Sequence, residues 1–278
     1  MTHKKKTTKG MVAGNIIMWI VALLFLFPAL WIVLCSFKPG NELFSIPPTL
    51  FPENPSFTSY LTTWQENNFL QYFINSMIVA VASTLITLLI NTMAGFAFAK
   101  YRFKGRDFIF MALLTTMMLP TEVIMRPTFT VVSALGLYNT LWGVIIPPIA
   151  TPTGIFLMRQ YFMGVPDSLL ESARIDGAGE VRIFATMMVP LAKPVISTLT
   201  ILSFMWRWND YVWPMLVISD QSKYTMQLAI ANLVGELAID WNVLLCASVI
   251  SMIPMLIVFA LFQKQIIASV MTSGLKEG

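Results

Sequence analysis

The sequence has little charge and few of the residues that carry out polar chemistry. Only 12% of its 278 residues are charged, whereas a soluble globular protein has roughly a quarter. His3 is the only histidine, and the two cysteines, Cys35 and Cys246, both lie in apolar runs. We therefore expect no metal site and no disulfide framework. In so apolar a chain the net charge of +4 does not indicate a nucleic-acid partner.

The motifs of nucleotide binding and hydrolysis are also missing. The chain has no G-x-x-x-x-G-K-[ST] loop, so it cannot itself hold ATP. It also lacks an H-E-x-x-H motif, a pair of catalytic carboxylates and a Ser/His arrangement, which argues against an intramembrane enzyme. We expect no catalytic residue and no cofactor bound by this chain.

Long uncharged runs dominate what is present. Hydrophobic residues make up 56% of the chain, and the mean hydropathy is +0.72. This composition predicts an all-α, multi-pass membrane protein. After a tail at residues 1–10, we expect one transmembrane domain over residues 11–278, a bundle of about six helices. The predicted spans are residues 11–35, 73–99, 108–137, 141–162, 195–219 and 243–262.

The distribution of lysine and arginine predicts the orientation of these spans. Of 18 such residues, four lie in the N-terminal tail and four follow span two. Four more lie within or next to residues 163–194, and two lie near the C-terminus. Positive residues favour the cytoplasmic side, so both termini and the 163–194 loop are predicted to be cytoplasmic. Four tryptophans are then expected in an aromatic belt near the outer interface: Trp31, Trp142, Trp213 and Trp241.

Two outer loops follow from this arrangement, at residues 37–71 and 220–240. Prolines in the first loop forbid a long helix, although residues 58–66 are compatible with a short one. One interpretation of the first loop is a lid over the bundle. The other, a face for an external partner, is implied by the resemblance of the chain to a known family.

The loop at residues 163–194 is predicted to form a helix-turn-helix. Pro166 and Asp167 suit a helix start, and Gly177 suits a left-handed C-terminal cap. The apolar residues expected to pack are Leu169, Leu170 and Ala173 in the first helix, and Val181, Phe184, Ala185 and Met188 in the second. From the residues alone, two interpretations are open. The loop packs on its own bundle with Glu171 and Arg174 paired, or it docks on a partner.

Two pairs of ionisable residues fall inside predicted spans, where such residues usually face a cavity or a partner. Glu122 and Arg126 lie in span three, and Arg207 and Asp210 in span five. At about 1.5 Å per residue, both pairs lie roughly 18–27 Å above the cytoplasmic end. We hypothesise that they line an outward vestibule for polar solute, together with Trp206, Asn209 and Trp213. The alternative is that each pair is an internal helix ion pair.

The loop at residues 163–194 carries the most specific pattern in the chain. The sequence resembles the cytoplasmic motif of the binding-protein-dependent ABC importer permeases, which reads Glu-Ala-Ala, three residues, Gly, nine residues, Ile-x-Leu-Pro. Glu171, Ala173, Gly177 and Pro190 match at the right spacing, while Ser172, Met187 and Val189 replace Ala, Ile and Leu. Residues 158–162, 173–178 and 208–211 look like the carbohydrate-uptake branch.

This resemblance implies a transport subunit of a bacterial cytoplasmic membrane. Its expected partners are two ATPase subunits that carry ATP and Mg, a second permease subunit expected to be a different chain, and an extracytoplasmic solute-binding protein. The residues expected to transmit ATPase closure are Glu171, Ala173, Arg174, Asp176, Gly177 and Pro190. Prolines within spans three and four are then candidate hinges for alternating access.

The solute implied is a sugar or oligosaccharide. Glycerol-3-phosphate or a related phosphodiester is the alternative, because residues 119–123 and 159–162 resemble glycerol-phosphate permeases. A stand-alone secondary transporter is a different class. It would need its own coupling-ion site and usually an internal repeat, and the sequence shows neither.

Overall fold

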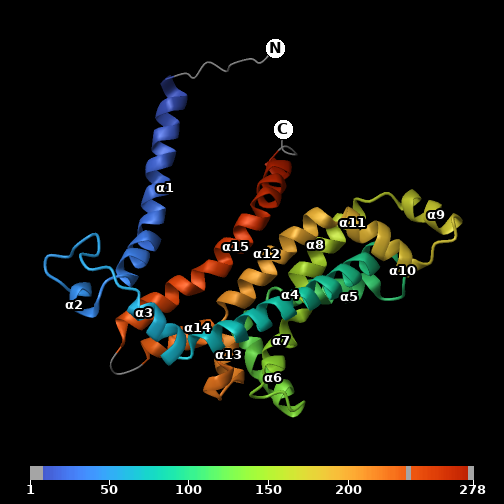
Figure 1. The fold of residues 1–278 in the computed structure, drawn as a ribbon. Coiled ribbons are helices and arrows are strands. Elements are labelled where there is room, and N and C mark those ends of the chain that lie inside the picture. The colour runs from blue at the N-terminus through green and yellow to red at the C-terminus, as the bar shows by residue number, and fades with distance from the viewer. Residues whose placement is uncertain (1–8, 236–238, 275–278) are drawn as a thin grey trace. The chain divides into compact units, whose positions relative to one another are not determined.

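The computed structural model describes residues 9–235 and 239–274, and that part of the chain is helical with no strand (Figure 1). The all-α prediction is therefore confirmed. Most of the predicted 1–10 tail, including His3, lies outside the described residues. The helices form two compact units, residues 1–69 with 233–252 and residues 70–232 with 253–278.

The first unit contains a long apolar helix followed by an irregular segment. Helix α1 (Lys9–Ser36) continues through Pro28. The segment after it is held by Lys38, whose ammonium donates to the Thr49 carbonyl at 2.5 Å and to the Thr49 hydroxyl at 3.1 Å. The predicted short helix at residues 58–66 is present. The other elements of this unit are α2 (Gly40–Leu43), α3 (Thr58–Leu61), the π-helical turn η1 (Thr62–Glu66) and the start of α15 (Trp241–Gly274).

The second unit is built around α4 (Phe69–Lys100) and α12 (Lys193–Asn209). In Figure 1, α9 and α10 lie at one end of this unit, and α6 and α13 lie at the other. Its remaining elements are α5 (Arg106–Thr116), α6 (Thr121–Ala134), α7 (Leu141–Ile145), η2 (Pro147–Ile149), α8 (Pro152–Met163), α9 (Asp167–Ile175), α10 (Glu180–Ile183), η3 (Phe184–Met188), α11 (Val189–Leu191), α13 (Val212–Val217), η4 (Gln221–Lys223), α14 (Met226–Val234) and the end of α15.

Three of the predicted spans are single helices long and apolar enough to cross a membrane, at Gly14–Ser36, Phe69–Lys100 and Trp241–Gln263. The predicted third span is instead two helices, α5 and α6, bent by 109°. The break falls at Pro120, which caps the start of α6, whereas Pro127 lies inside α6. A continuous rise along this span is therefore wrong, and with it the predicted depth of Glu122 and Arg126.

The predicted fourth span is also bent, by 40°, at its prolines. The predicted fifth span at 195–219 is not one helix, because α12 ends at Asn209 and the backbone of Asp210 is extended. The loop predicted at residues 220–240 contains a helix, α14. Helix α14 is attached to α4 by Ser76, whose hydroxyl accepts from the Met226 amide at 2.6 Å.

Trp213 is a further correction. It is 6% exposed, and its indole donates to the Gly143 carbonyl at 3.2 Å. A buried, hydrogen-bonded indole packs the fold and does not form part of an aromatic belt.

Candidate functional site

Helix α9 begins where the sequence predicts and is tied to the end of α4. Pro166 precedes its first residue, Asp167, whose carboxylate lies 2.5 Å from the Lys100 ammonium. The same ammonium donates to the Val165 carbonyl at 2.5 Å. The Lys100 hydrogen bond and charge hold the pKa of Asp167 below its ordinary value. The start of the loop is thus fixed to a membrane helix.

Helix α9 ends at Gly177 through local backbone geometry. Gly177 has a φ of +77°, the left-handed region that glycine adopts readily. Its amide donates to the Arg174 carbonyl at 3.0 Å, and the next amide, of Ala178, donates to the Ala173 carbonyl at 2.9 Å. These two bonds form a Schellman motif, so the predicted role of Gly177 as a cap is confirmed.

The apolar faces of the loop differ in part from the prediction. Leu170 and Ala173 are buried, but Leu169 is 41% exposed. In the second helix Ile183 and Met188 are fully buried, whereas Val181 and Ala185 are exposed. The reason is η3, a π-helical turn, which places residues five apart on one face instead of three or four.

The buried residues of the loop belong to one core with the membrane helices. Ala173 and Met188 pack with Phe96 of α4, Phe162 of α8 and Leu199 of α12. The hydroxyl of Tyr161 also donates to the Leu191 carbonyl. The loop is therefore packed against three membrane helices at once, α4, α8 and α12.

The rest of the predicted motif is exposed. Glu171, Asp176 and Pro190 all lie at the surface. Two large apolar side chains flank the turn at Gly177, Ile175 with 85% exposure and Val181 with 82%. The loop therefore buries one face against its own helices and presents another that is partly apolar.

An ion pair closes the turn, but with a different partner from the one predicted. Within the described chain, Arg174 bonds Glu180 through Nε at 2.7 Å and a terminal nitrogen at 3.3 Å, whereas Glu171 does not pair with Arg174. The hydroxyl of Tyr101, the residue after α4, donates to Glu180 Oε2, which also accepts from the terminal nitrogen of Arg174. These residues form the Tyr101–Glu180–Arg174 network, which joins α9, α10 and the segment after α4.

The electrostatics of this network are consistent with its geometry. Hydrogen bonds from Arg174 and then Tyr101 lower the pKa of Glu180. Burial and the Glu180 carboxylate raise the pKa of Tyr101 to about 12. Sequence reasoning missed Tyr101 and Glu180. A possible signal for Glu180 was its place just past the glycine turn, within reach of Arg174.

The second part of the candidate site is a cavity of about 640 Å³. It lies among α6, the break between α7 and α8, and the junction of α12 with α13. Five residues predicted for the vestibule line it: Trp206, Arg207, Asn209, Asp210 and Trp213. The other lining residues are Thr121, Ile124, Met125, Thr128, Pro147, Pro148, Thr151, Pro152, Thr153 and Met205.

Glu122 and Arg126 do not line this cavity. Both are exposed, and the residues of α6 that line the cavity are Thr121, Ile124, Met125 and Thr128. Their predicted place in the vestibule is therefore not supported by the geometry. The alternative ion pair between them is also not formed in the described part of the chain.

Arg207 and Asp210 lie in the cavity wall but bond separate backbone groups. The Arg207 guanidinium donates to the backbone carbonyl of Pro148, which lies in the break between α7 and α8. Asp210 accepts from the Trp213 amide at 3.2 Å. Because α12 ends at Asn209, Arg207 and Asp210 do not form the predicted ion pair within one helix. Each side chain instead bonds a backbone group at the cavity.

The break between α7 and α8 is held by Asn91 of α4, which is fully buried. Its amide nitrogen donates to the Thr151 hydroxyl at 2.6 Å, and its oxygen accepts from the Thr151 backbone amide at 3.2 Å. Non-helical backbone at membrane depth persists only where such partners satisfy it. Sequence reasoning did not single out Asn91.

Comparison with known proteins gives the class to which this arrangement belongs. Residues 91–272 match the family of binding-protein-dependent transport system inner membrane components, and the chain belongs to that family. It is a multi-pass, inner-membrane permease of an ABC importer and a transport subunit.

The chain is also similar to three permeases of individual transport systems. The chain is 33% identical over 279 residues to an arabinooligosaccharides transport system permease protein, AraQ, of Bacillus subtilis, covering 99% of each chain. It is 32% identical over 274 residues to an sn-glycerol-3-phosphate transport system permease protein, UgpE, of Pectobacterium atrosepticum, covering 95% of this chain and 98% of that one. A diacetylchitobiose uptake system permease protein, NgcG, of Streptomyces coelicolor is 32% identical over 259 residues, with 92% and 85% covered.

A solved structure has the same fold. It is the crystal structure of a bacterial ABC transporter involved in the import of the acidic polysaccharide alginate. The TM-score is 0.83 at 25% identity, with 95% of this chain and 99% of that chain covered.

Proposed function

We propose that this permease takes up solute by alternating access driven through the α9–α11 unit (residues 167–191). A partner ATPase would bind the exposed face of the unit, which carries Glu171, Asp176, Ile175 and Val181. Ala173, Arg174, Gly177 and Pro190 would keep the unit in shape. The observation that carries this proposal is the shared core with α4, α8 and α12.

The complex proposed around this chain has two ATPase subunits that bind ATP and Mg, a second permease subunit and an extracytoplasmic solute-binding protein. The α9–α11 unit and both termini would lie in the cytoplasm. Support comes from the lysine and arginine distribution and from the family to which the chain belongs.

We propose a neutral sugar or oligosaccharide as the solute. The cavity wall contains one cationic and one anionic side chain, Arg207 and Asp210, so its formal charges balance. Indole rings of Trp206 and Trp213 and hydroxyls of four threonines complete a wall of apolar and hydrogen-bonding groups. A glycerol phosphodiester is the second candidate, and the UgpE relatives favour it. The position of Arg126 away from the cavity argues against it.

Mass identification of the chains that co-purify with the permease in mild detergent tests the assembly. The expected set contains an ATPase and a second permease. Competition among ligands for the associated binding protein then tests the solute. Arabinose- or glucosamine-type oligosaccharides are expected to bind and glycerol-3-phosphate is not. Recovery of the permease without any ATPase would contradict the proposal.

A further inference from the structure

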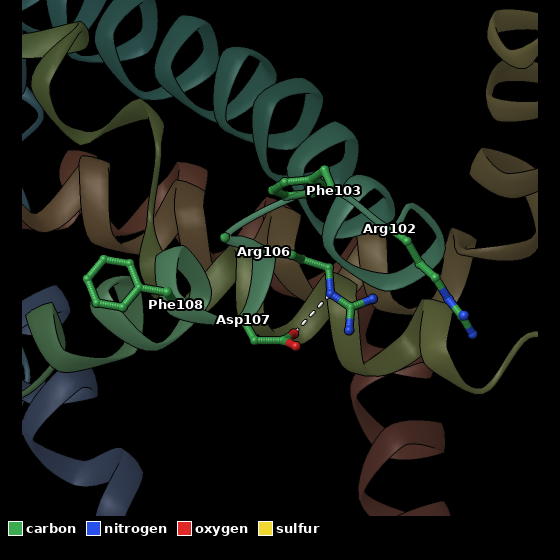
Figure 2. A pocket seen from close by; sticks show the side chains of 6 residues that line it. Arg102, Phe103, Arg106, Asp107 and Phe108 are labelled. Carbon is green, nitrogen blue, oxygen red and sulfur yellow. Dashed lines mark hydrogen bonds and ion pairs between the residues drawn. The ribbon is translucent and has the colours of Figure 1, made fainter.

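The loop between α4 and α5 forms a basic hollow that the transport proposal does not use. A cavity of about 340 Å³ is lined by Arg102, Phe103, Gly105, Arg106, Asp107 and Phe108. Figure 2 shows the guanidinium groups of Arg102 and Arg106 on one side of the loop, whereas the Phe108 ring points the other way. The hollow therefore has a cationic side and an aromatic side.

Its positive charge is only partly compensated. Arg106 bonds the Asp107 carboxylate at 2.9 Å, and Asp167 nearby is already bonded to Lys100 at 2.5 Å. In the described part of the chain, neither Arg102 nor Lys104 has an ion pair, and both are exposed. Two cations are thus available to an anion at this loop.

The surroundings of the loop are those of a membrane surface. It joins the end of α4, a 32-residue apolar helix, directly to α5. Phe103 is 42% exposed and Phe108 is 79% exposed. Next to them on α5, Ile109 and Met111 are 48% and 63% exposed. Basic side chains beside exposed apolar ones at this level match a phosphate headgroup with its acyl chains.

We propose that residues 102–108 bind the phosphate of an anionic phospholipid. Arg102, Lys104 and Nη2 of Arg106 contact the phosphodiester, and the acyl chains lie along Phe108 and Met111. Gly105, whose φ is +80°, makes the tight turn that brings Arg102 and Arg106 to the same hollow. The proposal depends on the membrane location of the chain and not on its solute or its ATPase.

Native mass spectrometry of the purified permease complex tests this site. The complex is titrated with phosphatidylglycerol, with phosphatidylcholine of the same acyl chains, and with inorganic phosphate. The expected result is retention of phosphatidylglycerol in preference to the other two. In the double variant Arg102→Gln, Lys104→Gln, we expect phosphatidylglycerol binding weaker by roughly thirty-fold, since each basic residue near an anionic surface contributes about a factor of five.

A matched control separates this site from a general loss of charge. The double variant Arg182→Gln, Lys193→Gln removes two other exposed cations and is expected to keep full lipid binding. The swap Arg102→Lys, Lys104→Arg should retain binding and shows that the loop tolerates substitution. Equal binding of phosphatidylcholine, equal loss in the control, or inorganic phosphate binding as tightly as the lipid would each overturn the proposal. So would loss of the ATPase from the Arg102→Gln, Lys104→Gln complex with lipid binding unchanged.

Discussion

Two glycines that lie two residues apart, Gly177 and Gly179, show how single residues shape the α9–α11 unit. Gly177 has a φ of +77°, whereas Gly179 has a φ of −72° in the extended region before α10. A Cβ at either position would meet open space. Any difference between their alanine variants therefore reports backbone conformation and not a steric clash.

Gly177→Ala is expected to destabilise the end of α9 by about 1–2 kcal/mol, the cost of a left-handed conformation for an L-residue. Gly179→Ala is the control and is expected to change stability little. Hydrogen exchange of the Gly177 and Ala178 amide positions, which close the Schellman motif, measures the effect. Equal protection in the two variants would show that the cap does not hold the helix end.

The Tyr101–Glu180–Arg174 network predicts a dependence on pH. The pKa of Glu180 is held below its ordinary value of 4.5, so the network's contribution is present above that value and is lost as pH falls through the lowered pKa. The pKa of Tyr101 is raised from 10.0 to about 12, so its contribution is present below 10.0 and is lost as pH rises through about 12. We expect a plateau between these limits.

The measurement is limited proteolysis of the turn at residues 176–179 across this pH range. Protection in the wild-type chain should be constant from about pH 5 to 10 and fall on either side. Glu180→Gln should remove the acid limb, because it no longer has a carboxylate to protonate. An acid limb that persists in Glu180→Gln would assign it to another group.

At the scale of whole elements, sequence patterns predict those helix ends that local backbone preferences determine. Pro166 and Gly177 delimit α9 through their own backbone preferences, and both ends were predictable. The π-helical turn η3 was not, since its buried spacing arises from packing against Phe96 and Phe162, distant in sequence. The end of α12 at Asn209 was also missed, because an apolar run does not reveal where a helix stops.

The α7–α8 break was predictable from its prolines, but its support was not. Asn91 lies 60 residues from Thr151, and nothing local marks it as that residue's partner. Replacing it leaves the Thr151 backbone amide without a side-chain acceptor in the described part of the chain. Asn91→Leu is therefore expected to lower stability by about 1–3 kcal/mol, the cost of a buried unsatisfied amide.

The control for Asn91→Leu is Thr87→Val on the same helix. Thr87 is fully buried, and its hydroxyl has no hydrogen-bond partner in the described chain, so an apolar isostere should be neutral or slightly stabilising. Thermal unfolding of the purified protein, followed by its own tryptophan fluorescence, compares the two. Equal midpoints for both variants would mean that Asn91 does not support the break.

At the scale of the whole molecule, the cavity and the α9–α11 unit lie at different ends of the second unit of helices. The proposed solute site and the proposed ATPase-binding site are therefore apart, as expected for a bundle that responds to events on two sides of a membrane. Asp210 and Trp206 line the cavity, and Glu122 does not. This difference provides a test within one bundle.

Uptake of an oligosaccharide by Asp210→Asn and Trp206→Ala is expected to fall by at least about tenfold, with complex assembly unchanged. Asp210→Asn replaces the one carboxylate of the wall, a strong hydrogen-bond acceptor, by a neutral amide, and Trp206→Ala removes an indole ring on which a sugar can stack. Glu122→Gln should transport normally. Initial rates of radiolabelled sugar uptake in proteoliposomes measure this. Normal uptake by Asp210→Asn together with loss in Glu122→Gln would place the pathway elsewhere.

The measurement that tests the central claim most directly is site-specific cross-linking from the exposed tip of the α9–α11 unit. Both natural cysteines are buried, so Ile175→Cys supplies a single accessible thiol for a short thiol-reactive photo-cross-linker. The account predicts that Ile175→Cys forms an adduct with the ATPase and that the adduct blocks uptake. Ser219→Cys, which follows α13 at the other end of the second unit of helices, is expected to form none. An Ile175→Cys protein that labels only from outside the cell, or that never reaches the ATPase while uptake continues, would contradict it.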